Sequence, residues 1–312
     1  MNEDKFLWVE KYRPQTIKEC VLPEHLKKPF QHYVDDGKIP NLILTGTAGV
    51  GKTTVARAMC EEIGADYILI NGSLESGIDT LRVKIVGFAS SVSLTGGRKV
   101  IIVDEADNLS NASQLGFRGV IEEMADNCTF IFTCNHFNKI LDAIHSRCAV
   151  IHFKLNGDDK KKMASEFMAR LRIILDGEKV KYDSKVLVEL IMKHFPDYRR
   201  ILNELQRYSV NGTIDIGILA QMSNTQIDEL IKYMKTKDFK SIRQWVGANS
   251  DTDSSIIMRE IFDKMFDIFK GPSVAVAVIL LGKYQDMATN VVDAEINLMA
   301  FLTELLVETE FK

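Results

Sequence analysis

The most constraining feature of the sequence is a glycine-rich loop between an apolar run and a helical pattern. The loop reads GTAGVGKTT over residues 46–54, follows the apolar run NLILT and opens the stretch TTVARAMCEEI. This is the pattern G-x-x-x-x-G-K-[ST] between a strand and a helix, where backbone N–H groups can cradle phosphates. A chance glycine turn would rarely have this context. The loop therefore predicts a nucleotide site in an α/β sheet.

The residues of this loop are expected to have separate roles in binding phosphates and Mg²⁺. Its glycines remove the Cβ atoms that would keep backbone N–H groups from turning inward. We expect Lys52 to reach the β- and γ-phosphates and the Thr53 hydroxyl to bind Mg²⁺. The loop residues expected to bind the nucleotide are Gly49, Val50, Gly51, Lys52, Thr53 and Thr54.

Residues 40–153 alternate short β-branched runs with helical stretches. The runs are NLILT, DYILIN, KVIIVDEAD, CTFIFTCN and AVIHF. Each is nearly continuous in apolar residues, which is typical of strands buried on both faces of a parallel sheet. The alternation predicts a doubly wound parallel sheet, and hence an α/β nucleotide-binding domain over residues 1–153.

After residue 153 the pattern becomes helical. The runs KMASEFMARLRIIL and SKVLVELIMKHF predict a small helical domain over residues 154–224. Apolar stripes at helical spacing, followed by the run INLMAFLTELL, predict an all-α domain over residues 225–312. The first stripe is Ile227, Leu230, Ile231 and Met234, and the second is Ile257, Ile261, Met265 and Phe269.

Composition excludes several classes of protein. A chain of 312 residues with 46% apolar content predicts a soluble globular protein of two or three domains. The longest apolar run, VAVAVILL, is too short for the ~20 residues that span a bilayer, and the start lacks the pattern of a signal peptide. Five cysteines without a C-x-x-C pair predict free thiols in a reducing cytoplasm. A net charge of -4 requires any DNA contact to be local.

Two acidic residues end the run KVIIVD. Asp104 and Glu105 are expected at the carboxyl edge of the sheet, where ligands bind. Asp104 can hold Mg²⁺ and Glu105 can polarise an attacking water, which favours hydrolysis over transfer to another acceptor. The alternative is that both residues only end the strand or cap the following helix. Asn135 ends the next run and could orient the same water, although asparagine at a strand end is often a turn former.

The chain as a whole resembles the AAA+ sliding-clamp-loader ATPases, especially the large subunit of T-even-type phage loaders and the small subunits of replication factor C. The motifs EKYRP, GKTT, DEAD, TCN, SRC and FPDYRRILNEL occur in family order over about residues 9–215. SRC is the most diagnostic, because other AAA+ proteins lack it at this place. The resemblance implies ATP and Mg²⁺ as ligands, a helical lid over residues 154–224 and an oligomerisation collar over residues 225–312.

The resemblance also assigns two arginines. In this family the arginine of SRC, here Arg147, points into the ATP site of a neighbouring subunit and stabilises transition-state charge in trans. The alternative is a local salt bridge. Arg199 would reach ATP from the lid in cis, with Arg200 as the other choice. The family usually has Gly-Asp where this chain has Pro196-Asp197, which leaves the start of this helix open.

Further contacts are implied by the resemblance alone. The segment that wraps adenine would comprise Val9, Glu10, Lys11 and Tyr12, with Val21 on the base, although core packing explains these residues equally well. Ile78 and Arg82 would face DNA from the start of a helix, where a solvated helix face is the alternative. Val92 and Leu94 would touch the clamp. Gln114 could couple the DNA channel to the ATP site, although a surface position is the simpler expectation.

The resemblance implies the ATP-hydrolysing subunit of a loader that opens a sliding clamp, places it on primer–template DNA and releases it upon hydrolysis. Expected partners are the clamp, a small loader subunit, the DNA and copies of the chain itself, four with one companion subunit in a ring. The expected location is the cytoplasm, that of the host if the chain is phage-encoded. Rival hypotheses are another AAA+ motor such as a branch-migration helicase, a non-hydrolysing structural subunit of the same ring, and a P-loop kinase.

Overall fold

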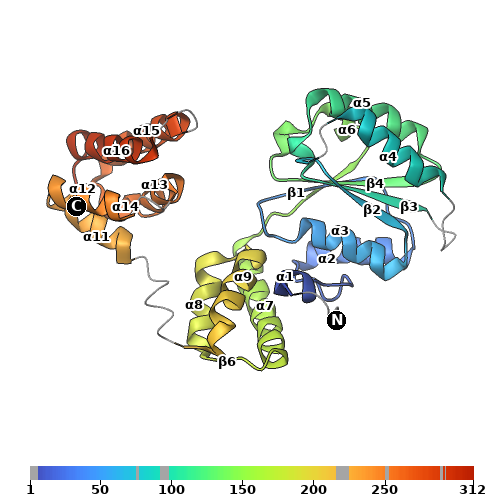
Figure 1. Ribbon diagram of the computed structural model, residues 1–312, viewed down its shortest axis with the longest axis horizontal. Helices are drawn as coiled ribbons and strands as arrows, with labels where there is room; N and C mark the ends of the chain where they lie inside the picture. Colours follow the sequence, from blue (N-terminus) through green and yellow to red (C-terminus); the bar gives the residue numbers. More distant parts are fainter. Residues whose placement is uncertain are drawn as a thin grey trace. The chain divides into compact units, whose positions relative to one another are not determined.

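The structure is a computed structural model and describes residues 6–74, 77–91, 98–215, 225–249, 253–288, 291 and 293–312. It divides into two compact units, Met1–Leu219 and Ala220–Lys312. Figure 1 gives the labels of their helices and strands. The domain boundaries expected near residues 153 and 224 stay predictions.

A five-stranded parallel sheet forms the centre of the first unit (Figure 1). Its strand order is β2-β3-β4-β1-β5. This order makes β1, β4 and β3 neighbours, so that the loops after these three strands meet at one edge. The strands are β1 (Leu42–Thr45), β2 (Tyr67–Asn71), β3 (Lys99–Asp104), β4 (Cys128–Cys134) and β5 (Ala149–His152).

Burial differs between the centre and the edges of this sheet. Every residue of β1 and β4 is buried, as is all of β3 except Asp104. In contrast, Leu69 of β2 is 39% exposed, and Ala149 and His152 of β5 are exposed. The expectation that all five strands are buried on both faces is therefore wrong for β2 and β5. These are edge strands, each with a single neighbour among the strands that the structure describes.

Helices cover both faces of the sheet and make a three-layer α/β domain (Figure 1). Alternate strand residues enter two separate cores: Ile43 packs with Phe117 on one face, whereas Leu42 packs with Phe30 on the other. The helices and short helical turns of this domain are α2 (Glu24–Asp35), α3 (Lys52–Ile63), α4 (Ile78–Ser90), η1 (Ala106–Asn108), α5 (Asn111–Glu123), η2 (Phe137–Lys139) and α6 (Asp142–His145).

The lid domain follows in the same unit. It consists of α7 (Gly157–Gly177), α8 (Ser184–His194), α9 (Tyr198–Tyr208) and η3 (Ser209–Asn211). Two short strands, β6 (Lys181–Tyr182) and β7 (Thr213–Ile214), pair in parallel, so the expectation of helices alone after residue 153 is wrong in this detail. The first helix of the chain, α1 (Trp8–Lys11), packs against α9 of the lid.

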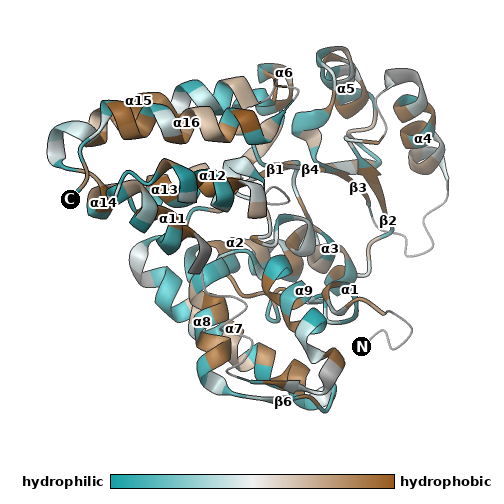
Figure 2. Ribbon diagram, turned by 60° about the vertical axis from the view of Figure 1, so that its left-hand side comes forward, coloured by the Kyte–Doolittle hydropathy of each residue, from teal (hydrophilic) through white to brown (hydrophobic). Residues whose placement is uncertain are grey.

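The second unit is all-α in its described residues, apart from an isolated bridge between Phe269 and Phe311. The first apolar stripe lies on one helix, but the second is divided between α13 and α14 and ends at Phe269, beyond both. Figure 2 shows apolar residues on several sides of α15 and α16. The helices are α11 (Thr225–Lys235), α12 (Phe239–Ala248), α13 (Ser254–Asp263), α14 (Met265–Ile268), α15 (Gly271–Ala288) and α16 (Ala294–Glu308).

Two expectations from composition concern cysteines and membranes. The five cysteines are free, and all but Cys148 are buried, which confirms the prediction of free thiols. Within the described ranges, no helix combines the length and apolarity needed to cross a bilayer.

Candidate functional site

A pocket opens at the carboxyl edge of the sheet, between the α/β domain and the lid. We call residues 6–22, which contain α1, the N-terminal strap. The pocket is bordered by the loop after β1, the ends of β3 and β4, the strap, and helices α7 and α9. Its lining includes Val9, Tyr12, Val21, Gly49, Val50, Gly51, Lys52, Thr53, Thr54, Asp104, Glu105, Thr133, Asn135, Phe167, Arg170, Tyr198 and Arg199.

Glycine is required at two positions of the loop after β1. Gly49 has φ 76° and Gly51 has φ 95°, both in the left-handed region that other residues rarely adopt. A Cβ on Gly49 would also lie 1.9 Å from Oδ1 of Asp197. Gly51 precedes the first residue of α3, so the loop turns directly into a helix whose first N–H groups have no partner in the helix. Such a turn suits an anion.

Lys52 is buried at the centre of the pocket, only 7% exposed. Its Nζ donates hydrogen bonds of 2.8 Å to the carbonyls of Gly46 and Thr47 and to Oδ1 of Asn135. Burial lowers the pKa of Lys52, and nearby acidic groups such as Asp104 act in the opposite direction. The structure thus brings two residues of the predicted catalytic set, Lys52 and Asn135, into direct contact.

The two residues predicted to hold a metal also meet. The Thr53 hydroxyl donates a hydrogen bond of 2.7 Å to Oδ1 of Asp104. One hydroxyl and one carboxylate are hard oxygen donors, and they suit Mg²⁺ when phosphate oxygens and water complete its octahedron. No cluster of three or more His, Cys, Asp or Glu side chains forms a metal cage in the described part of the chain. The donor set therefore fits Mg²⁺ delivered with a nucleotide.

Glu105 has an unusual backbone conformation for a residue other than glycine, with φ 54°. Its N–H donates a 3.2 Å hydrogen bond to the hydroxyl of Thr133. Its carboxylate accepts a hydrogen bond from Ser73 Oγ, which in turn accepts one of 2.8 Å from Asn108 Nδ2. The carboxylate predicted to activate water is therefore held at the pocket by side chains that the sequence did not single out.

Asn135 is positioned by a buried carboxylate. Oδ2 of Asp107 accepts hydrogen bonds from the backbone N–H groups of Asn135 (3.2 Å) and His136 (2.9 Å). Asp107 is 6% exposed and lies in η1, the short helical turn that begins directly after Glu105. It connects the turn after β3 to the turn after β4. Asp107 is the last letter of DEAD, the one signal by which the sequence could have identified it.

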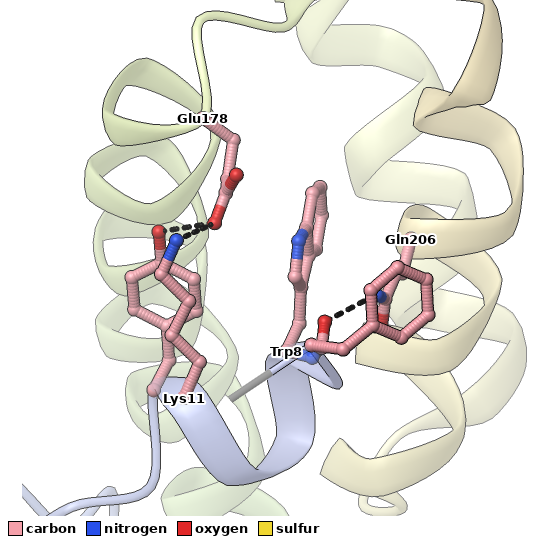
Figure 3. A network of polar contacts seen from close by, with 6 residues as sticks. Trp8, Lys11, Glu178 and Gln206 are labelled. Atoms are coloured by element: carbon pink, nitrogen blue, oxygen red, sulfur yellow. Dashed lines mark hydrogen bonds and ion pairs between the residues drawn. The ribbon is translucent and has the colours of Figure 1, made fainter. Parts of the chain in front are cut away.

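The strap brings only part of its predicted set into the pocket. Val9, Tyr12 and Val21 line it, whereas Glu10 pairs with Arg13. Figure 3 shows Lys11 directed at Glu178, which follows α7; Lys11 Nζ and Glu178 Oε1 are 2.8 Å apart. Contacts of all five predicted residues with adenine stay predictions.

Arg199, and not Arg200, lines the pocket from the first turn of α9. The preceding residue, Tyr198, ties this helix to the α/β domain: its N–H donates to the carbonyl of Gly49 (3.2 Å) and its hydroxyl to the carbonyl of Val21 (3.4 Å). The start of α9 therefore rests on both the phosphate loop and the strap. Tyr198 lies in the motif FPDYRRILNEL, but no role was predicted for it from the sequence.

Arg147 is not part of the pocket of its own chain. It lies between α6 and β5, and both Nε (3.0 Å) and Nη2 contact Oε1 of Glu122. Its Nη1 donates hydrogen bonds of 2.9 Å to the carbonyl of Ala143 and to Ser146 Oγ. The local salt bridge considered as the alternative is thus present. Action in trans stays a prediction and requires Arg147 to leave Glu122.

The predicted DNA and clamp residues are only partly described. Ile78 is the first residue of α4, and its side chain is outside the described set. Arg82 is exposed and pairs with Glu123 at 2.9 Å. Val92 and Leu94 lie outside the described residues. None of these four assignments is tested.

Gln114 is 1% exposed, so the simpler expectation of a surface position is wrong. Its Nε2 donates to the carbonyls of Leu109 (3.3 Å) and Lys139 (2.9 Å), and its Oε1 accepts from the Leu141 N–H at 2.8 Å. A side chain with three such bonds replaces its hydration with protein partners. It joins α5 to the segment that leads to α6.

Comparisons with known proteins identify the family. The profile of the AAA family (ATPases associated with various cellular activities) matches residues 42–156. The profile of the sliding-clamp-loader large subunit AAA+ ATPase lid domain matches residues 159–220. Sliding-clamp-loader large subunits of Escherichia phage RB69 and Enterobacteria phage T4 are each 34% identical to the chain, covering 100% of it and 99% of each relative. The chain belongs to the sliding-clamp-loader family of AAA+ ATPases.

Two more similarities support this family and its fold. A replication factor C small subunit of Natronomonas pharaonis is 33% identical over 83% of the chain and 81% of the relative. A solved structure of Thermotoga maritima RuvB matches with a TM-score of 0.53 at 17% identity, covering 71% of this chain and 79% of that one. The latter shows the AAA+ fold alone. As a clamp-loader ATPase the chain hydrolyses ATP, which confirms the sequence-based hypothesis of an AAA+ hydrolase.

Proposed function

We propose that this chain is the ATP-hydrolysing subunit of a loader that opens a sliding clamp and places it on primer–template DNA. The observation that supports it most is the convergence of Lys52, Thr53, Asp104, Glu105 and Asn135 at one pocket that the lid also borders. A subunit that did not hydrolyse ATP would have no need for all five. The family relationship supplies the clamp and DNA as the partners.

The roles of these residues follow from their geometry. Lys52 and the N–H groups at the start of α3 would hold the β- and γ-phosphates. Thr53 and Asp104, already hydrogen-bonded to each other, would hold Mg²⁺, which would neutralise phosphate charge. Glu105 would accept a proton from the attacking water, and Asn135 would orient that water once phosphate oxygens replace it on Lys52.

The site as proposed is completed by a neighbouring subunit. Arg147 would leave Glu122 and meet the γ-phosphate bound by the next copy, a type of contact worth ~10³–10⁵ in rate. The pair it leaves is cheap to break, because the Glu122 side chain is 60% exposed. We propose four copies with one small subunit in the ring. Ile78 and Arg82 would contact DNA, and Val92 and Leu94 the clamp.

The second unit suits a role in holding this ring together. Soluble monomers rarely expose large contiguous apolar patches. Here Ile296 and Val307 on α16 border one hollow and are 67% and 73% exposed, and Ile279 on α15 is 70% exposed. These side chains support the proposal that the described helices of residues 225–312 form an oligomerisation collar.

The rival functions have less support. The likeness to RuvB, titled a Holliday junction branch migration motor in one structure, is at 18% identity and concerns the fold alone. A structural subunit of the ring would not need the complete hydrolytic set. A P-loop kinase would require an acceptor pocket, and no observation favours one.

A single comparison of rates tests the proposal. The ATPase rate of the purified chain is measured alone, and then with a matching small subunit, clamp and primer–template DNA together. We expect a low rate for the chain alone and a stimulation of at least about 100-fold in the complete mixture, because Arg147 acts only in the assembled ring. Full hydrolysis by the isolated chain, unaffected by DNA, would contradict the proposal.

A further inference from the structure

The N-terminal strap is attached to the lid through polar contacts at both of its ends. At one end the side chain of Gln206 on α9 bonds the strap twice. Its Oε1 accepts from the Trp8 N–H (2.9 Å), and its Nε2 donates to the carbonyl of Phe6 (2.8 Å). Figure 3 shows this pair beside the side chain of Trp8, a residue that is 5% exposed. Because both bonds join one side chain to backbone atoms, they fix the position of this part of the strap.

The other side of α1 is bound by a single carboxylate. Oε1 of Glu178 accepts hydrogen bonds from Lys11 Nζ (2.8 Å) and Tyr12 OH (2.6 Å), as Figure 3 shows. Burial alone would raise the pKa of Glu178, but the hydrogen bonds from Lys11 and Tyr12 outweigh it and lower the pKa. Glu178 is therefore ionised at neutral pH, and its bonds to the strap are charge-assisted.

A half-buried arginine on α7, Arg170, holds the part of the strap that borders the pocket. Nη2 of Arg170 donates to the carbonyl of Tyr12 (3.0 Å), and Nη1 donates to the carbonyl of Glu19 (2.9 Å). These two carbonyls lie at the two ends of the turn that contains Arg13 and Pro14. Both of these residues also line the pocket. One rigid guanidinium fork therefore fixes the width of that turn, as the single ammonium of a lysine could not.

The phosphate loop and the strap line the same pocket, so a nucleotide whose phosphates lie on the loop would extend its base toward the strap. We propose that Arg170 and Glu178 are positioning residues for the base: through them the lid holds the strap in the conformation that receives the purine ring. This inference rests on the nucleotide site proposed above.

Two nucleotide-site ligands separate this role from a general effect on the lid. Fluorescent N-methylanthraniloyl-ATP is titrated into the full chain with Mg²⁺, and ATP and tripolyphosphate are then used as competitors. Tripolyphosphate has the phosphates of ATP without its base or ribose. We expect Arg170→Met to weaken ATP about tenfold and Glu178→Gln about threefold, with tripolyphosphate unchanged within twofold.

Matched controls come from the same helix. Arg172 and Asp176 are exposed on α7, and we expect Arg172→Met and Asp176→Asn to leave both affinities within twofold of the wild type. Arg170→Lys keeps the charge without the fork, and we expect an intermediate loss. Circular dichroism of each variant checks that it is folded.

Two results would overturn the inference. One is that Glu178→Gln, together with a folded Arg170→Met or Arg170→Lys, binds ATP as tightly as the wild type does. The other is an equal loss for ATP and tripolyphosphate, which would mean that these residues act on the pocket as a whole. Failure of the underlying nucleotide site would be distinguished from both, because the wild type itself would then not bind ATP.

Discussion

Glu105 combines a strained backbone with a central place in the proposed chemistry. A left-handed conformation at a residue other than glycine costs about 1–3 kcal/mol and persists only when the surroundings impose it. Here the surroundings are a close approach by Gly72, where a Cβ would lie 2.5 Å from the Glu105 carbonyl, and the bond from the Glu105 N–H to Thr133. Gly72 is therefore needed for the turn that aims this carboxylate.

Replacement of this carboxylate should separate binding from hydrolysis. Glu105→Gln keeps the size of the side chain and removes the base, so we expect ATP to bind within about threefold of wild-type affinity while turnover falls at least about 100-fold. Nucleotide titration and steady-state ATPase assays of the assembled complex measure the two effects. Glu189→Gln, at an exposed position of the lid, is the matched control. Near-normal turnover of Glu105→Gln would remove the proposed base from the mechanism.

At the scale of elements, the sequence predicts those features that depend on local pattern. The phosphate loop, the acidic end of β3 and the helices of the lid follow from residue spacing, and the structure contains them all. Spacing does not reveal which strand lies at an edge, so the exposure of β5 was not predicted. It also does not reveal where a helix breaks: one apolar stripe continues through Lys264, where α13 ends and α14 begins.

Contacts between distant segments account for the rest of what the sequence missed. Glu178 and Tyr12 are 166 positions apart, and neither has a neighbour in sequence that indicates the other. The same holds for Arg170 and the Tyr12 carbonyl, 158 positions apart. The burial of Gln114 depends on carbonyls of two other segments. Such pairs are decided by tertiary packing, for which a single sequence has no periodic signal.

The end of α8 gives the lid a dependence on pH. Burial lowers the pKa of His194 to about 4, with Arg200 and Lys193 adding to the effect and Glu204 and Asp197 opposing it. The unfolded chain, with an ordinary histidine pKa near 6.5, takes up a proton first as the pH falls. The stability that His194 contributes as a neutral group is therefore complete above about pH 6.5 and is lost as the pH falls toward its folded pKa.

Removal of His194 should flatten this dependence. We expect the wild type to lose about 1–2 kcal/mol more free energy of unfolding than His194→Gln between pH 7 and pH 5. Urea denaturation followed by circular dichroism at several pH values measures the difference. His32→Gln is the control, because the side chain of His32 is 71% exposed. Parallel stability curves for the wild type and His194→Gln would contradict a buried, neutral His194.

At the scale of the whole molecule, the proposed active site belongs to two chains. Lys52 and Glu105 lie at the pocket of one chain, whereas Arg147 lies outside that pocket and pairs with Glu122. Adjacent copies in a ring meet through unlike surfaces, so each copy can lend its arginine to one neighbour and receive one from the other. Two chains with defects in different halves of the site should then restore one another.

Mixing variants tests this division directly. Arg147→Ala and Lys52→Ala should each be inactive when assembled alone with the small subunit, clamp and DNA. In an equal mixture, random pairing places an intact pocket against an intact Arg147 at roughly a quarter of the interfaces between copies, so we expect up to that fraction of wild-type activity. A mixture of Lys52→Ala with Glu105→Gln damages the same half of the site in both chains and should stay inactive. Equal activity in the two mixtures would contradict a shared site, because complementation requires each chain to keep intact the half of the site that the other chain lacks.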